Sequence, residues 1–226
     1  SPLDRPVRTT LMRVALFPLS TVLFPQGVLP LRVFEARYLD MVRDCMREGT
    51  LFGVCMITDS RASDVSRTTA LAEVGCLARI DAWDMKQLGL LHIRAVGQDR
   101  FRLLGTETQD DGLVIADAEL IDPDDDAPVP PEHRPCVDLL SRIMDDLRIQ
   151  FEERRGAEDA PDQDDALAQI PFAEPFHMES SAWVSNRLCE VLPVPLKAKQ
   201  RLMELTDAPT RLQIVHTYLK QHSVLA

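Results

Sequence analysis

Side chains capable of covalent or phosphate chemistry are few in this sequence, and they form no recognised motif. An ATP-driven motor needs a GxxxxGK[ST] loop that cradles phosphates, yet none of the nine glycines is followed by lysine. The sequence also lacks GxSxG, HExxH, CxxC and GxGxxG, which place nucleophiles, metal ligands or dinucleotides. We therefore assign no catalytic and no cofactor-binding residue, and we expect a protein that is not an enzyme.

An acidic run has part of the spacing of a calcium loop. Asp122, Asp124 and Asp126 fall at positions one, three and five of an EF-hand loop. The sharp-turn position, however, holds Ala127 instead of glycine, and the bidentate position holds His133 instead of glutamate. We interpret the run as a solvated acidic linker. The histidines lack the i+3 or i+4 partner of a helical metal pair, so we expect ordinary surface or strand histidines and no metal.

Two short segments carry residues that suit recognition of a partner. The first places a large aromatic between turn residues, where it could meet an extended peptide at a rim or plug one end of a small barrel: Leu23, Phe24, Pro25 and Gln26. The second is Arg37 and Tyr38. Their helical spacing favours the alternative in which Arg37 pairs with an acidic neighbour and Tyr38 fills the core. These six residues are our candidate peptide-binding residues.

Composition limits the classes of partner and the compartment. Lys+Arg 25 and Asp+Glu 36 give a net charge of −11, so the average field repels nucleic acid. The five cysteines are odd in number and widely spaced among apolar residues, which is typical of reduced core thiols in the cytoplasm. No apolar run reaches the length of a membrane span, and the first residues do not resemble a signal peptide. We expect a soluble cytoplasmic protein.

The elements that must position these residues change in kind along the chain. Apolar runs broken by glycine and proline predict strands at residues 12–17, 72–83, 90–96, 100–104 and 113–120, with a helix from residue 37 that ends at Gly49. Residues 1–121 therefore predict a small, strongly bent antiparallel sheet with one packed helix. A linker at 122–131 precedes a helical part at 132–226. We expect its helices at 134–151, 179–191, 195–205 and 208–222, around an acidic loop at 152–169.

Several segments resemble the N-terminal, substrate-binding domain of Lon protease, and in particular the free-standing bacterial members of that family. The similarity is carried by Phe34-Glu35-Ala36-Arg37-Tyr38 and Phe52-Gly53-Val54, then by the runs at 74–80 and 96–102. This resemblance implies an α+β fold with a barrel of the PUA-like type, named after pseudouridine synthase and archaeosine transglycosylase domains, followed by a C-terminal helical bundle. It also implies that the ATPase and protease domains of Lon are absent from this chain.

The function that the resemblance implies is recognition of unfolded or extended polypeptide, as an adaptor or holdase in protein quality control, with a protease as a candidate partner. The alternative is an RNA-binding PUA-like module, since RNA-modifying enzymes share the barrel type. That alternative requires a basic stripe in an acidic chain, for example from Arg94, Arg100 and Arg102. A small-molecule pocket between barrel and bundle is a third possibility.

Overall fold

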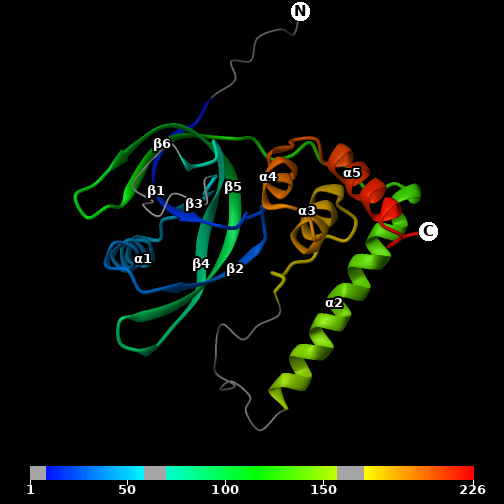
Figure 1. Cartoon of the computed structure of the whole chain (residues 1–226), viewed down its shortest axis with the longest axis horizontal. Coiled ribbons are helices and arrows are strands. Elements are labelled where there is room, and N and C mark those ends of the chain that lie inside the picture. Colours follow the sequence, from blue (N-terminus) through cyan, green and yellow to red (C-terminus); the bar gives the residue numbers. More distant parts are fainter. Residues whose placement is uncertain (1–8, 59–69, 157–170) are drawn as a thin grey trace, which may run out of the picture.

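Six strands form one strongly bent sheet in the computed structural model, which describes residues 9–58, 70–156 and 171–226 (Figure 1). The strands are β1 (Leu11–Leu19), β2 (Val28–Val33), β3 (Phe52–Met56), β4 (Val74–Gln87), β5 (Leu90–Thr108) and β6 (Val114–Leu120). Their order is β2-β5-β4-β3-β1-β6, and a further pairing of β5 with β6 closes the sheet on itself. The predicted small barrel is confirmed, and β2 is left at an edge.

The strand directions differ from the prediction at one pair. β1 and β3 run parallel, with Leu16 opposite Gly53 and Leu19 opposite Met56, whereas the other pairs of these strands are antiparallel. Parallel neighbours need a long crossover connection, and here β2 and the first helix supply it. Local sequence patterns could not reveal this pairing because it depends on the path of the whole crossover.

β5 is one long strand where we expected two separate strands at 90–96 and 100–104. Gly97 and Gly105, which suggest breaks in the sequence pattern, lie within the strand. A side chain at Gly97 would collide with the backbone carbonyl of Phe24, and the pairing with β6 shifts register between Leu103 and Gly105. Glycine therefore permits close approach and bending here without ending the strand.

The helix α1 (Ala36–Glu48) packs on the barrel as predicted. Tyr38, Met41, Val42 and Cys45 point from one face into a hydrophobic cluster that also holds strand residues. Gly49 follows with φ 66°, the left-handed conformation that commonly ends a helix, and its N–H donates to the carbonyl of Cys45. The spacing of apolar residues and the glycine thus define this helix from the sequence alone.

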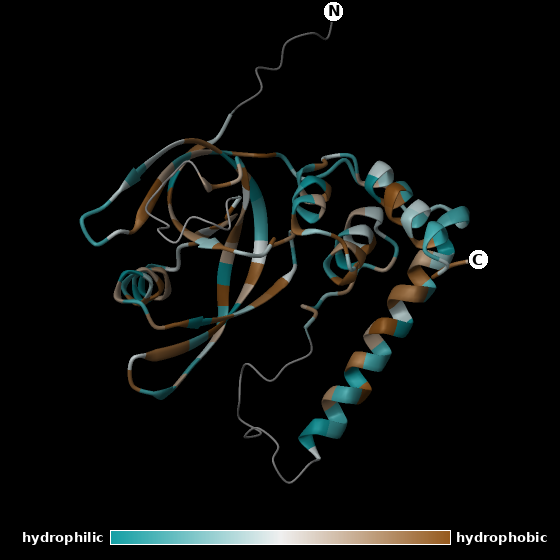
Figure 2. Ribbon diagram, viewed as in Figure 1, coloured by the Kyte–Doolittle hydropathy of each residue, from teal (hydrophilic) through white to brown (hydrophobic). Residues whose placement is uncertain are grey.

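Helices form the C-terminal part, which lies to one side of the barrel (Figure 1). After a 3-10 turn, η2 (Pro131–His133), come α2 (Arg134–Arg155), α3 (Ser181–Val191), α4 (Leu196–Glu204) and α5 (Ala208–Gln221). α2 runs four residues further than predicted, so residues 152–155 of the expected acidic loop are helical; residues 157–169 of that loop lie outside the described residues. Figure 2 shows the alternating apolar and polar surface of α2.

The acidic linker is anchored between the barrel and the helices. The carboxylate of Asp124, whose side chain is 8% exposed, pairs with Arg100 of β5 at 2.5 Å and also with Arg211 of α5. Asp126 accepts hydrogen bonds from the Ser180 hydroxyl at 2.6 Å and the Ala182 N–H at 2.9 Å, at the start of α3. The interpretation of the run as simply solvated is therefore wrong for Asp124, which joins the two parts of the molecule.

All five cysteines are buried and free, as predicted. Burial raises the pKa of the Cys55, Cys76 and Cys189 thiols to about 12, which keeps them protonated and poorly nucleophilic. Within the described residues, no helix combines the length and the apolar character needed to cross a membrane.

Candidate functional site

The loop between β1 and β2 directs its aromatic residue inward. Phe24 is 1% exposed and packs in one hydrophobic cluster with Leu188 of α3 and Met203 of α4. Leu23 is also buried, but it belongs to the cluster inside the barrel. Phe24 is therefore neither exposed at a rim nor inside the barrel, because its ring is buried between the barrel and the helices. Sequence reasoning could not decide this, because the covering helices lie more than 150 residues further along the chain.

Backbone hydrogen bonds hold this loop in a tight turn against β5. The Gly27 N–H donates to the Phe24 carbonyl at 2.9 Å, and Gln26 adopts a positive φ of 63°. The Gln26 N–H donates to the Gly97 carbonyl and the Gly97 N–H to the Gly27 carbonyl, both at 2.8 Å. Gln26 is exposed and Pro25 half-buried. These bonds fix the position of the loop relative to the barrel.

A buried arginine connects the loop to α3. Arg187, 1% exposed, donates from Nη2 to the Pro25 carbonyl at 2.6 Å and to Glu190 Oε1 at 2.7 Å. A methyl group at Gly27 would lie 2.5 Å from Glu190 Oε1, so glycine is needed for this close approach. Burial raises the pKa of the Glu190 carboxyl, while Arg187 acts in the opposite direction. A charged, hydrogen-bonded junction thus joins barrel and bundle.

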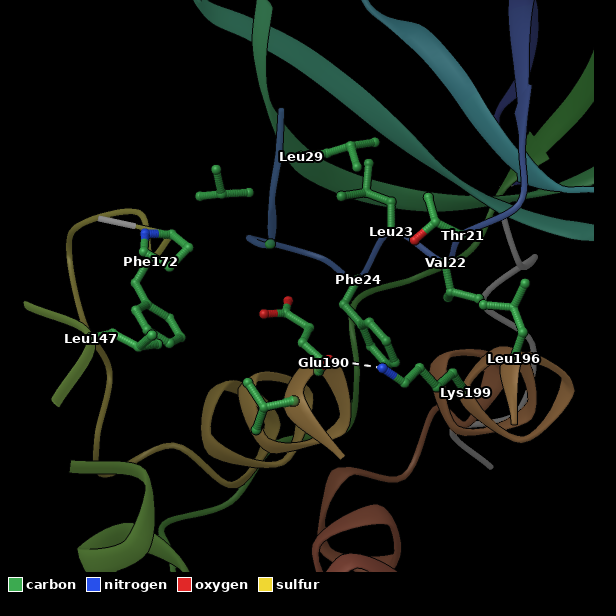
Figure 3. A pocket seen from close by; sticks show the side chains of 14 residues that line it. Thr21, Val22, Leu23, Phe24, Leu29, Leu147, Phe172, Glu190, Leu196 and Lys199 are labelled. Atoms are coloured by element: carbon green, nitrogen blue, oxygen red, sulfur yellow. Dashed lines mark hydrogen bonds between the residues drawn. The ribbon is translucent and has the colours of Figure 1, made fainter. Parts of the chain in front are cut away.

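A cavity of about 280 Å³ lies beside this junction, between the β1–β2 loop and the helices (Figure 3). Its lining is largely apolar, with a few polar groups from Thr21, Glu190 and Lys199. The apolar lining comprises Val22, Leu23, Phe24, Val28, Leu29, Leu147, Pro171, Phe172, Val191 and Leu196. The Lys199 Nζ donates to the backbone carbonyl of Glu190 at 2.8 Å, so this lysine caps the end of α3. The arrangement suits an apolar group more than a charged one.

One wall of this cavity comes from an extended segment that precedes α3. Phe172 is 5% exposed and forms an isolated antiparallel β-bridge with Gly27. Figure 3 shows its ring beside Leu147, away from the Phe24 ring. No local pattern around Phe172 indicates this position, because its partner Gly27 lies far back in the chain.

Arg37 and Tyr38 lie apart from the cavity, on α1 at the other side of the barrel (Figure 1). The Tyr38 ring stacks on Phe17 with centroids 4.3 Å apart and is 7% exposed. Arg37 pairs with Glu35 at 3.0 Å and donates to the Gly112 carbonyl at 2.9 Å. The favoured structural alternative is therefore correct for this pair. The six candidate residues do not form one surface, because only Leu23 and Phe24 line the cavity.

The arginines required by the RNA alternative do not form an exposed stripe. Arg100 is 2% exposed and ion-paired to Asp124. Arg94 is 8% exposed and pairs with Asp81 at 2.9 Å, while Arg102 faces Glu119 at 3.7 Å. Each cation has a carboxylate beside it, so these residues present no free positive surface for phosphates.

Two histidines that we expected to be unrelated meet in the helical part. His133 Nδ1 and His216 Nδ1 lie 2.5 Å apart, and both residues are buried. They are separated by 83 positions, so spacing gave no signal of the contact. The expectation of surface or strand histidines is wrong for this pair. Among the described residues, no group of three or more His, Cys, Asp or Glu could hold a metal ion.

The bent sheet with its packed helix and the C-terminal helices together form a two-part α+β domain of the kind found at the N-terminus of Lon proteases. The family model of the ATP-dependent protease La (LON) substrate-binding domain matches residues 13–221, and the chain therefore belongs to this family. It is similar to the crystal structure of a Lon N-terminal domain protein from Xanthomonas campestris, with 31% identity and a TM-score of 0.68. That likeness covers 92% of this chain and 98% of the other.

More distant relatives share the fold or a part of the sequence. The likeness to the N-terminal domain of the Mycobacterium avium complex Lon protease covers 93% of this chain and 100% of that domain. At 12% identity and a TM-score of 0.55, it is a likeness of fold alone. Lon protease 1 of Sorangium cellulosum is 25% identical over 205 residues, which is 88% of this chain and 23% of that protein. Cereblon of Danio rerio is 31% identical over 103 residues, which is 44% of this chain and 23% of cereblon. The chain thus spans less than a quarter of these curated relatives.

Proposed function

We propose that this chain is a non-enzymatic module that binds unfolded or extended polypeptide, acting in the cytoplasm as an adaptor or holdase in protein quality control. The observation that carries the proposal is the apolar cavity between the β1–β2 loop and the helices. Membership in a family of substrate-binding domains, whose Lon relatives are proteases, supports polypeptide as the ligand class. A protease is the candidate partner to which such a module would deliver its client.

The volume of the cavity indicates how much of a client it can hold. At about 280 Å³ it is at the small end of ligand cavities, so it can take one or two large apolar side chains. The rest of an extended client remains outside and loses conformational freedom on ordering. We therefore expect micromolar or weaker affinity, about −8 kcal/mol or less favourable at 25 °C.

A charge placed on the cavity wall tests this proposal. Val191 lines the cavity and is 41% exposed, so Val191→Glu adds an anion there with little effect on folding. The matched control is Ile214→Glu on α5, where a β-branched residue is 44% exposed away from the cavity. Fluorescence anisotropy with a labelled 12-residue peptide rich in Leu and Phe measures the affinity. We expect Val191→Glu to weaken binding at least fivefold and Ile214→Glu to leave it unchanged.

Two results would contradict the proposal. The first is absence of peptide binding up to millimolar concentration, and the second is equal loss in both variants. A single-stranded RNA oligonucleotide in the same assay examines the rival function, and the net charge of −11 leads us to expect no binding at physiological salt. Salt-sensitive RNA binding without peptide binding would favour the rival.

A further inference from the structure

β2 is the edge strand of the sheet, and only its first residues, next to the cavity, can pair with another strand. β2 pairs with β5 along one side, and the Gly27 carbonyl just before it accepts from the Gly97 N–H. Because antiparallel strands alternate between residues that face the partner and residues that face away, Val28, Pro30 and Arg32 direct their backbone groups outward. Pro30 has no N–H, so strand pairing along this edge is limited to its beginning.

A segment of the same chain already lies at that beginning. Phe172 forms an antiparallel bridge with Gly27, and its ring is buried among residues that line the cavity. The backbone is paired at the sheet edge while a large apolar side chain forms one wall of the cavity beside it. This is the arrangement by which an extended peptide adds to a sheet, with main-chain pairing for affinity and a pocket for side-chain choice.

We propose that clients bind in extended form at the β2 edge, beside Gly27 and Val28, with an aromatic or large aliphatic side chain in the position of Phe172. Residues 171–173 occupy this edge until a client replaces them. The inference rests on the proposed polypeptide-binding function and adds its binding mode and its internal competitor. Competition lowers the apparent affinity by the fraction of molecules in which the edge is free, so the occupied edge sets a threshold for weak clients.

Removal of the Phe172 ring tests the competitor. In Phe172→Ser the segment loses its anchor, and we expect the labelled peptide to bind at least threefold more tightly than to the wild type. The matched control is Phe176→Ser, four residues further on, where the ring is 39% exposed and packs beside Trp183 outside the cavity. The control should bind as the wild type does. Weaker binding by Phe172→Ser would mean that Phe172 is part of the client site and would overturn the proposal.

Hydrogen exchange of the wild-type protein decides the matter even if Phe172→Ser folds poorly. With saturating peptide, we expect the amides of Phe172, Ala173 and Glu174 to exchange at least threefold faster, since their segment is displaced. Unchanged or slower exchange would overturn displacement.

A backbone-modified peptide tests the edge pairing separately. The same peptide with alternate backbone nitrogens methylated keeps its side chains but loses its donors, and we expect it to bind at least tenfold more weakly. Equal affinity would overturn edge pairing. The proposed function stands if peptide binds the wild type and Val191→Glu weakens that binding. If the Phe172→Ser, hydrogen-exchange and methylated-peptide tests then contradict displacement and edge pairing, only this inference fails. If no peptide binds at all, both fail.

Discussion

The Phe24 ring, at the boundary between barrel and helices, is expected to contribute strongly to the stability of the fold. Its ring is 1% exposed and packs in one cluster with residues of α3 and α4. We expect Phe24→Ser to lower the free energy of unfolding by about 3–5 kcal/mol, through lost burial and the cavity left behind. Phe34→Ser is the control, since that ring is 66% exposed. Its free energy of unfolding, measured by urea denaturation, should change by less than about 0.5 kcal/mol. Equal stabilities would contradict the burial of the Phe24 ring between barrel and helices.

Asp124 carries a second residue-scale prediction. Its carboxylate lies between the buried guanidinium groups of Arg100 and Arg211, so Asp124→Asn leaves two buried cations without a counter-ion. We expect a loss of about 3–5 kcal/mol in urea denaturation. Asp117→Asn removes a carboxylate that is 63% exposed and paired with Arg13, and it should cost less than about 1 kcal/mol. A comparable loss in both variants would show that the buried Asp124 carboxylate stabilises the fold no more than an exposed one does.

At the scale of elements, the contact between His133 and His216 joins η2 to α5. Burial lowers the pKa of His216 below 6.5, and His133 and Lys220 lower it further. As the pH falls below about 6.5, the unfolded chain takes up this proton before the folded protein does, so stability is present above that pH and is lost below it. The helical part should therefore weaken in mild acid.

Urea midpoints at pH 7.5 and pH 5.5 check this pH dependence. We expect the wild type to lose stability on acidification and His216→Gln to lose less. His177→Gln, at an exposed position, should behave as the wild type does. A His216→Gln protein with the full wild-type loss would assign the acid sensitivity to other groups.

The elements differ in how far the sequence determines them. α1 could be predicted because its apolar spacing and Gly49 are local signals, and α5 because the Asp207 cap and Pro209 mark its start in the chain itself. The Asp207 side chain does accept from the Thr210 N–H at 3.0 Å. The parallel β1–β3 pair, the continuous β5 and the Phe172 bridge could not be predicted, because each depends on residues brought together by the complete fold.

The candidate site follows the same division. The loop at Leu23–Gln26 was found because an aromatic residue between turn residues is a local signal. The cavity wall from Leu147, Glu190 and Leu196 was not found, since these residues lie on three helices whose packing sets their distance from the loop. Burial of Arg187 was equally invisible, because arginine is usually exposed unless a partner compensates its charge.

At the scale of the whole molecule, we predict that the purified chain shows neither ATPase nor protease activity. The sequence offers no phosphate loop and no nucleophile motif, and burial keeps the Cys55, Cys76 and Cys189 thiols protonated. Purified protein should neither release phosphate from ATP nor cleave unfolded casein. A malachite-green assay and gel analysis over several hours measure both. Activity that follows the protein through successive columns at constant specific activity would contradict this expectation.

The hydrogen bond from Arg187 to the Pro25 carbonyl spans 162 positions of the chain. A ribosome adds about 5–20 residues per second, so roughly 10–30 s pass between synthesis of the β1–β2 loop and synthesis of the helix that covers it. Throughout that interval the Phe24 ring lacks the helices that cover it, and the strands up to Leu120 become available to pair before those helices do. During that interval the nascent chain itself carries an exposed apolar segment of the class that the finished protein is proposed to bind.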